Sequence, residues 1–191
     1  MLILVLGIIL FLGTHSIRIV ADSWRTKQIE QGGAARWKGI FSIVSIAGFA
    51  MIVWGFGLAR LSPVSLWLPP NWTRHLTASL MLIAFILLVA TYVPGNRIKA
   101  LVDHPMLLAV ALWAAAHLAA NGTLADSTLF GAFLIWSVID FSVCRRRDRN
   151  AGVIYPVIGI WRDLLVVGIG LIAFAGFAHY GHLWLIGVNP L

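Results

Sequence analysis

The chain has 191 residues, of which 60% are apolar and only 11% are charged, and its formal net charge is +7. Soluble domains are about 45–50% apolar and about 25% charged. A soluble globule of this size cannot bury so many apolar side chains. The composition therefore excludes a soluble enzyme, a disordered chain and a nucleic-acid-binding protein. It predicts an all-α, polytopic membrane protein whose main partner is the lipid bilayer.

Six apolar stretches are about as long as a helix that crosses a bilayer. We therefore predict a single domain over residues 1–191, with six transmembrane helices in one bundle. The predicted spans are residues 2–20, 39–59, 76–93, 105–121, 127–144 and 164–188. Helix-breaking residues support these limits: Pro94-Gly95 follows the third stretch, Pro105 opens the fourth, and Asn121-Gly122 ends it.

Two of the connecting segments have the composition of the membrane interface. Residues 62–74 contain three prolines and two tryptophans, which predicts an interfacial loop with its indoles at headgroup depth. Residues 151–161 are apolar but interrupted by Gly152, Pro156 and Gly159. That segment is too broken to span, so we predict that it is interfacial or re-entrant.

The lysines and arginines predict the orientation. Twelve of the fourteen lie in or beside the first, third and fifth connectors. Loops rich in these residues stay in the cytoplasm, so both termini are predicted to lie outside, in the periplasm. Topology thus accounts for the positive charge without a nucleic-acid partner. Cys144 is the single cysteine, so no disulfide partner is predicted within the chain.

Histidines stand out among the polar residues of the spans, because ionisable groups within a membrane are rare and usually face the bundle interior. His15 lies in the first span, and Arg18 follows three residues later on the same helix face. One interpretation is an axial iron ligand, with Arg18 placed to meet an anionic group such as a haem propionate. The other is a histidine that bonds to a backbone carbonyl on a neighbouring helix while Arg18 extends inward towards water.

Two further histidines belong to the fourth span. His104 precedes Pro105 at its start, where capping of the helix is the simpler interpretation and a binding role is the alternative. His117 lies well inside the same span among alanines, where it either fills a groove between helices or reaches a ligand.

The remaining polar residues favour simpler interpretations. His179 and His182 are three residues apart near the outer end of the sixth span, a spacing that can hold a metal, but solvated interfacial side chains are favoured. His75 is interpreted in the same way. Asp140 could relay protons, although pairing with the arginines that follow Cys144 is simpler.

Thr14-His15-Ser16, together with His104-Pro105 and the stretch from Trp113 through His117 to Gly122, resembles the NnrU family over essentially the whole chain. These are bacterial inner-membrane proteins associated with nitrite and nitric oxide respiration. The family is similar to the plastid 15-cis-zeta-carotene isomerase, which uses haem b held by histidines. The resemblance implies a multi-pass protein of the bacterial inner membrane in which His15 and His117 ligate haem iron, with His104 in the same constellation and Arg18 nearby.

The resemblance implies haem binding more directly than it implies isomerase chemistry. Ala114 stands where the isomerase has a cysteine, so a thiolate ligand at that place is lost. The fifth span, around Trp136, has no histidine, whereas the isomerase has a pair there. If the protein is an enzyme, the resemblance implies a haem-dependent isomerase or redox enzyme, and it identifies no substrate.

A second function is compatible with the same sequence. Small residues recur on the fourth and sixth spans, including Gly168, Ala175 and Gly176, and such faces let helices approach closely. The alternative is therefore a non-catalytic assembly or partner factor for a membrane respiratory complex.

Overall fold

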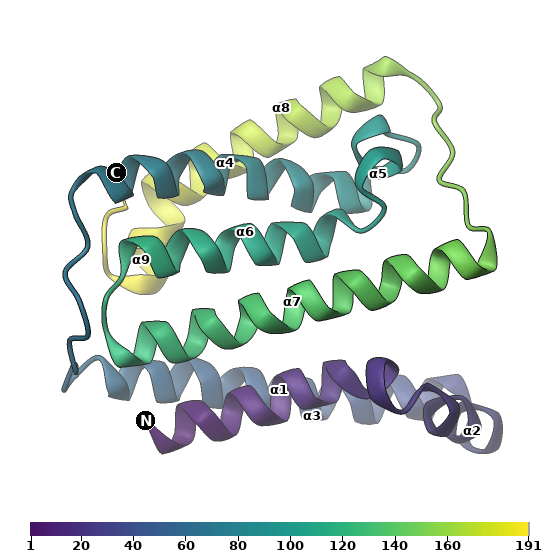
Figure 1. Cartoon of the computed structure of the whole chain (residues 1–191), viewed down its shortest axis with the longest axis horizontal. Helices are drawn as coiled ribbons and strands as arrows, with labels where there is room; N and C mark the ends of the chain where they lie inside the picture. Colours follow the sequence, from purple (N-terminus) through teal and green to yellow (C-terminus); the bar gives the residue numbers. More distant parts are fainter. Residues whose placement is uncertain (191) are drawn as a thin grey trace. The chain divides into compact units, whose positions relative to one another are not determined.

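The computed structural model describes residues 1–190, and these form helices joined by short connectors (Figure 1). The helices are α1 (Leu2–Val20), α2 (Asp22–Gly32), α3 (Ala34–Ala59), α4 (Trp72–Tyr92), α5 (Arg97–Val102), α6 (Pro105–Ala120), α7 (Leu124–Ala151), α8 (Ile160–Gly176), the π-helical turn η1 (Phe177–Gly181) and α9 (His182–Ile186). An isolated bridge between Ser65 and Thr123 is the β pairing found within residues 1–190. The predicted all-α class is confirmed.

Five helical stretches are long and apolar enough to cross a membrane. They are Leu2–Val20, Ala34–Ala59, Trp72–Tyr92, Leu124–Ala151 and Ile160–Ile186. The sixth predicted span is α6, which is apolar but has 16 residues. At about 1.5 Å per residue α6 is about 24 Å long, less than the roughly 30 Å of a bilayer core. The six predicted segments are all helical, while the count of six crossings and the outer placement of both termini stay predictions.

Two segments differ from the sequence-based expectations, and a third stays a prediction. The first connector contains α2, a polar helix that ends where Gly33 adopts φ 81°. Helix α7 continues beyond residue 144 to Ala151, because arginines are good helix formers and extend the helix past its apolar part. Residues 153–159, in the segment predicted to be interfacial or re-entrant, have no regular secondary structure.

The described chain divides into two compact units. Unit 1 consists of Met1–Trp67 and Thr123–Ala132, and unit 2 of Leu68–Gly122 and the residues from Phe133 onward. Helix α7 therefore contributes its first residues to unit 1 and its remainder to unit 2.

Unit 1 is built on the pairing of α1 with α3, which lie side by side (Figure 1). Three glycines allow this approach. A Cβ on Gly7 would lie 2.7 Å from the backbone nitrogen of Ile52, and one on Gly48 would lie 2.8 Å from that of Phe11. A Cβ on Gly55 would collide with the backbone of Leu4. Close backbone contact through small residues is how helices associate where lipid removes the hydrophobic driving force.

In unit 2, α4 packs against both α6 and α8. Ala84, Leu87 and Ala109 form a buried cluster between α4 and α6. Thr77 donates a hydrogen bond from its hydroxyl to the carbonyl oxygen of Ala116, 2.9 Å away, which ties the two helices together. Gly170 provides the close approach of α8 to Ile86 of α4.

Asn96 joins α4 to α5, and its side chain is almost fully buried, with 1% of the residue exposed. Its amide nitrogen donates to the carbonyl oxygens of Ala90 and Val93, and its Oδ1 accepts from the backbone N–H of Lys99 at 2.7 Å. Asn96 thus caps the start of α5 while it satisfies two carbonyls at the end of α4. This junction places the turn that leads into α6.

Candidate functional site

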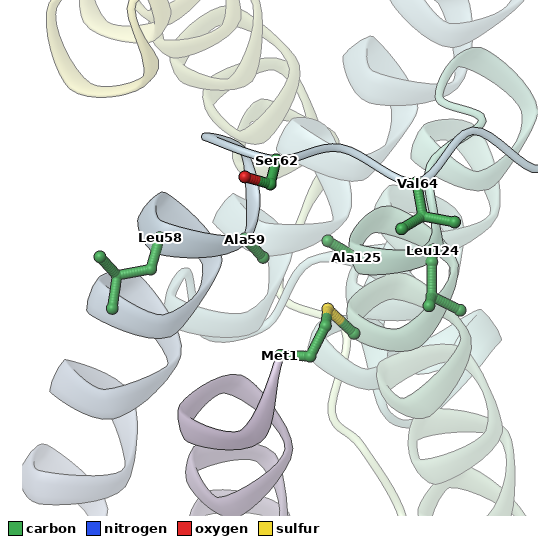
Figure 2. A pocket seen from close by; sticks show the side chains of 7 residues that line it. All are labelled: Met1, Leu58, Ala59, Ser62, Val64, Leu124 and Ala125. Carbon is green, nitrogen blue, oxygen red and sulfur yellow. The ribbon is translucent and has the colours of Figure 1, made fainter.

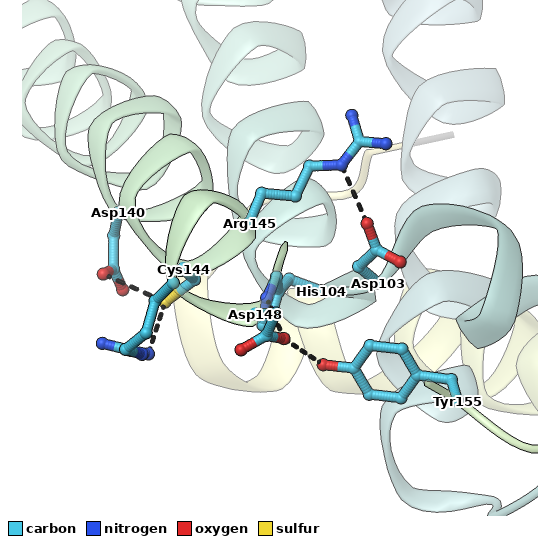
Figure 3. A network of polar contacts seen from close by, with 8 residues as sticks. Asp103, His104, Asp140, Cys144, Arg145, Asp148 and Tyr155 are labelled. Atoms are coloured by element: carbon cyan, nitrogen blue, oxygen red, sulfur yellow. Dashed lines mark hydrogen bonds and ion pairs between the residues drawn. The ribbon is translucent and has the colours of Figure 1, made fainter. Parts of the chain in front are cut away.

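A cluster of titratable side chains lies in unit 2, where α6 begins and α7 ends (Figure 3). Its centre is Asp148 of α7. The Nε2 atom of His104 lies 3.0 Å from Oδ2 of Asp148, and the Tyr155 hydroxyl donates a 2.6 Å hydrogen bond to the same oxygen. The side chains of His104 and Asp148 are 19% and 18% exposed, so the pair is largely shielded from solvent. One carboxylate oxygen therefore links a histidine and a tyrosine from separate segments.

The ring of His104 is held in place by aromatic neighbours. It packs edge-on against Phe141 of α7 and against Tyr155, with centroid distances of 6.3 and 6.2 Å. The predicted helix start at Pro105 is confirmed, and His104 is the residue before it, but its side chain makes no capping hydrogen bond. The contact with Asp148 takes the place of the capping that the sequence favoured.

Asp103, beside His104, has an unusual backbone. It has φ 63° and ψ −58°, and the N–H of His104 bonds to the carbonyl oxygen of Val102 at 2.7 Å, so Asp103 is the central residue of a γ-turn. This turn conformation is rare and strained for a residue with a side chain. The Asp103 carboxylate accepts a 2.8 Å hydrogen bond from Nε of Arg145, which fastens the turn to α7.

A second polar chain follows the same end of α7. The Sγ atom of Cys144 lies 3.5 Å from Oδ1 of Asp140, and Arg147 donates to Sγ at 3.2 Å. Asp140, predicted to pair with the arginine run, therefore has the thiol between itself and Arg147 (Figure 3). These contacts connect residues of one helix face to each other.

The environment of Tyr155 favours its neutral form. Burial, the hydrogen bond to Asp148 and the negative charges of Asp148 and Asp103 raise the pKa of Tyr155 to about 12. Lys99 lies over the same ring, with Nζ 5.7 Å from its centroid. Tyr155 therefore acts as a hydrogen-bond donor to Asp148 throughout the physiological range.

A titration tests this assignment. We expect the phenolate absorbance of Tyr155, isolated as the difference between the natural chain and Tyr155→Phe, to appear only near pH 12. Asp148→Asn should lower that pKa, although burial, the largest cause of the shift, remains and keeps it above the ordinary tyrosine value. A raised pKa stabilises the folded chain below pH of about 10, and this contribution is lost as the pH rises through the folded-state pKa. An unchanged Tyr155 titration in Asp148→Asn would show that the carboxylate does not control it.

The cluster has the parts of an acid–base site. The Asp148 carboxylate lies at ion-pair distance from Nε2 of His104, in a geometry that is not a hydrogen bond, and it accepts the hydrogen bond of Tyr155. Sequence reasoning identified His104 but missed Asp148 and Tyr155. In the sequence, Asp148 is an acidic residue within a run of arginines, and Tyr155 is the single tyrosine of residues 151–161. Neither feature indicates that the residue contacts His104.

His15 lies on α1 in unit 1. Its Nδ1 is 2.8 Å from the carbonyl oxygen of Phe11, so the carbonyl lies one turn earlier in its own helix and not on a neighbouring helix as predicted. The ring packs against Phe11 and edge-on against Phe41 of α3. A carbonyl only accepts, so Nδ1 carries the proton and Nε2 carries the lone pair of the neutral ring. Arg18 turns to Asp22, 3.9 Å away, with a side chain that is 53% exposed.

His117 lies on α6 in unit 2 and repeats this arrangement. Its Nδ1 is 2.8 Å from the carbonyl oxygen of Trp113, again one turn earlier, and its ring packs against the Trp113 indole. Asn121 donates its side-chain amide to the carbonyl oxygen of His117 at 2.8 Å, which ends α6. His117 is thus fixed in the same tautomer as His15.

The donor chemistry of both histidines fits an axial ligand. A metal-ligating histidine almost always donates its other ring N–H to a carbonyl or carboxylate, which orients the ring and makes the ligating nitrogen more basic. Haem iron takes one or two such ligands. No group of three or more His, Cys, Asp or Glu able to hold a metal ion occurs within residues 1–190.

The other histidines lie at the ends of helices. His75 and His179 are exposed, and Nδ1 of His182 lies 2.7 Å from the carbonyl oxygen of Val188. His179 falls in the π-helical turn η1, and His182 begins α9. His182 thus contacts the backbone that follows α9. The three-residue spacing of His179 and His182 does not indicate this contact.

A cavity of about 210 Å³ lies at one end of unit 1 (Figure 2). Ligand pockets typically measure about 300–1,000 Å³. Seven residues line it: Met1, Leu58, Ala59, Ser62, Val64, Leu124 and Ala125. Their side chains include a thioether and a hydroxyl but no titratable group.

The fold and composition define a multi-pass integral membrane protein of the all-helical class. The family model described as NnrU protein matches residues 3–190, nearly the whole chain, so the protein belongs to the NnrU family. No curated protein and no solved structure matches the chain.

Proposed function

We propose that the protein binds haem b through His15 and His117 and serves nitrite and nitric oxide respiration in the bacterial inner membrane. The observation that carries the proposal is the shared tautomer of the two histidines, each with Nδ1 directed to a carbonyl oxygen at 2.8 Å. Bound haem b would supply a one-electron redox centre. Membership of the NnrU family supports the same assignment.

Under this proposal, each helix performs a defined task for its histidine. The edge-on contact with Phe41 of α3 holds the imidazole ring of His15 in place, with 5.1 Å between the two ring centroids. The Trp113 carbonyl and the Asn121 cap fix the ring and the backbone of His117 at the end of α6. His104, with Asp148 and Tyr155, is then a separate acid–base group and not an iron ligand, because Nε2 of His104 faces a carboxylate.

An optical spectrum tests the proposal. Protein purified in detergent from haem-replete cells is expected to show a Soret band that shifts on reduction, with about one haem per chain. His15→Ala and His117→Ala should each reduce the haem content at least tenfold, since an axial ligand is lost. His75→Ala removes an exposed histidine and is the matched control. A folded natural chain without a Soret band would refute haem binding.

The same preparation distinguishes the second candidate function, a partner factor of a membrane respiratory complex. Gly168 and Gly176 of α8 have no atom within 4 Å of where a Cβ would stand, so space for an approaching helix exists there. A haem-free chain that purifies with a stoichiometric protein partner would support this function. A haem-loaded chain that purifies alone would support the first.

A further inference from the structure

A stripe of exposed apolar side chains runs along the part of α7 that belongs to unit 2. Ile135, Val138 and Ile139 are 64%, 52% and 49% exposed. Their spacing of three and four residues places them on one face of the helix. Because α7 is one of the candidate membrane-spanning helices, side chains this exposed contact acyl chains or another apolar surface in the membrane.

The same helix face continues into two arginines. Arg146 follows Ile139 by seven residues, which is about 10 Å along the helix axis, and Arg149 follows Arg146 by three residues. Both are exposed, and neither side chain has a hydrogen bond, ion pair or ring contact within residues 1–190. Residues three apart on a helix have Cβ atoms about 5–6 Å from each other, so these two positive charges repel each other unless an anion lies between them.

The other two arginines of this run have partners. Arg145 donates to the Asp103 carboxylate (Figure 3), and Arg147 donates to Sγ of Cys144. Arg147 lies about 100° around the helix from Arg146, so it belongs to a different face from the apolar stripe. The two arginines that continue the stripe thus receive no anion from the part of the chain that the structure describes.

Exposed apolar side chains also follow the two arginines. Val153 and Ile154, just beyond the end of α7 at Ala151, are 47% and 87% exposed. Arg146 and Arg149 therefore lie along the chain between two exposed apolar segments. This pattern fits the headgroup region, where basic side chains near a helix end meet phosphates while neighbouring apolar side chains contact acyl chains.

We infer that this face of α7 binds an anionic phospholipid, with the phosphate between Arg146 and Arg149 and an acyl chain along Ile139 and Ile135. A guanidinium donates two parallel N–H bonds to phosphate oxygens, so two of them on one helix face suit one phosphate. Two uncompensated cations favour an anionic lipid over a zwitterionic one, whose ammonium group they repel. A second copy of the chain fits this face less well, because a symmetric pair would bring the same two arginines together without a carboxylate.

The test measures the lipid that the full chain retains. Protein is reconstituted in nanodiscs that contain equal amounts of phosphatidylcholine and phosphatidylglycerol, extracted into mild detergent, and analysed by native mass spectrometry. We expect one phosphatidylglycerol to be retained in preference to phosphatidylcholine. Arg146→Gln and Arg149→Gln should each weaken this retention about fivefold, the effect of one basic residue at a headgroup. Both variants should fold, because the side chains are exposed and glutamine is a good helix former.

Arg147→Gln is the matched control. It removes the same charge from the same run, but from the face that carries Cys144, and it should leave retention unchanged. Ile139→Ala keeps every charge and shortens the apolar stripe, so it should weaken retention by a smaller factor than either arginine variant.

Four results would overturn the inference. Equal losses in Arg146→Gln and Arg147→Gln would mean that diffuse charge attracts the lipid. Equal retention of the two lipids would remove the anionic preference. Displacement of the lipid by inorganic phosphate, with no effect of Ile139→Ala, would indicate a phosphate site without an acyl chain. A lipid-free dimer that Ile139→Ala dissociates would assign the face to a second copy of the chain. The measurement does not depend on haem, so its failure is distinct from failure of the haem proposal.

Discussion

Gly55→Ala is expected to destabilise unit 1 by about 2–3 kcal/mol. The added Cβ would collide with the backbone of Leu4, and backbone atoms of a packed helix cannot move aside as a flexible side chain can. Helix α1 must therefore shift away from α3, which removes van der Waals contacts that in lipid have no hydrophobic substitute. Reversible unfolding in mixed detergent micelles, followed by circular dichroism, measures this loss.

Gly57→Ala is the control for Gly55→Ala. Gly57 lies on the same helix, and nothing lies within 4 Å of its Cβ position. The substitution should be neutral or should stabilise α3 by about 0.5–1 kcal/mol, because alanine has the higher helix propensity. A loss at Gly57 as large as that at Gly55 would mean that helix propensity or expression, and not the contact with α1, causes the effect.

The same displacement connects packing to the proposed site. His15 is on α1 and is held by Phe41 of α3, so a shift of α1 against α3 moves the ring away from its edge-on contact at 5.1 Å. If His15 is an iron ligand, Gly55→Ala also lowers haem content, whereas Gly57→Ala leaves it intact. Under the haem proposal, the close packing that Gly55 allows therefore also holds the ring of His15 in place.

Much of the fold follows from the sequence because its signals are local. The stretch 2–20 coincides with α1, and Pro105 opens α6, since apolar length and proline geometry each act within one segment. Helix α2 was missed because it is polar on every side. The helix is stabilised by the ion pair between Asp22 and Arg25 and ends at Gly33. Only the structure shows that these features belong to one helix.

The candidate site was only partly predictable, because its contacts join residues that are far apart in the sequence. His104 has a recognisable neighbour in Pro105, but Asp148 is on another helix, and no local pattern shows that they meet. The γ-turn at Asp103 is equally hidden, because an aspartate before a histidine does not by itself require a positive φ. The i−4 carbonyl contacts of His15 and His117 are local and could have been expected from helix geometry.

Asn96→Ala is expected to cost unit 2 about 3 kcal/mol. The substitution removes the cap on the Lys99 N–H and leaves the buried carbonyl of Ala90 and the partly buried carbonyl of Val93 without their amide donor. A lost cap costs about 1 kcal/mol, and each buried group left unsatisfied costs about 1–3 kcal/mol. Because α5 leads directly into the strained turn at Asp103, its release also loosens the contact between His104 and Asp148.

Asn71→Ala provides the comparison, because Asn71 stands at the start of α4, is exposed and makes no side-chain cap hydrogen bond. It should change stability by less than about 0.5 kcal/mol. The two effects of Asn96→Ala are separable by measuring unfolding in mixed micelles and the phenolate titration of Tyr155 on the same samples. Loss of stability with a Tyr155 pKa still near 12 would mean that the Asp148 cluster holds without α5. A parallel fall of both would mean that the buried amide of Asn96 positions the acid–base site.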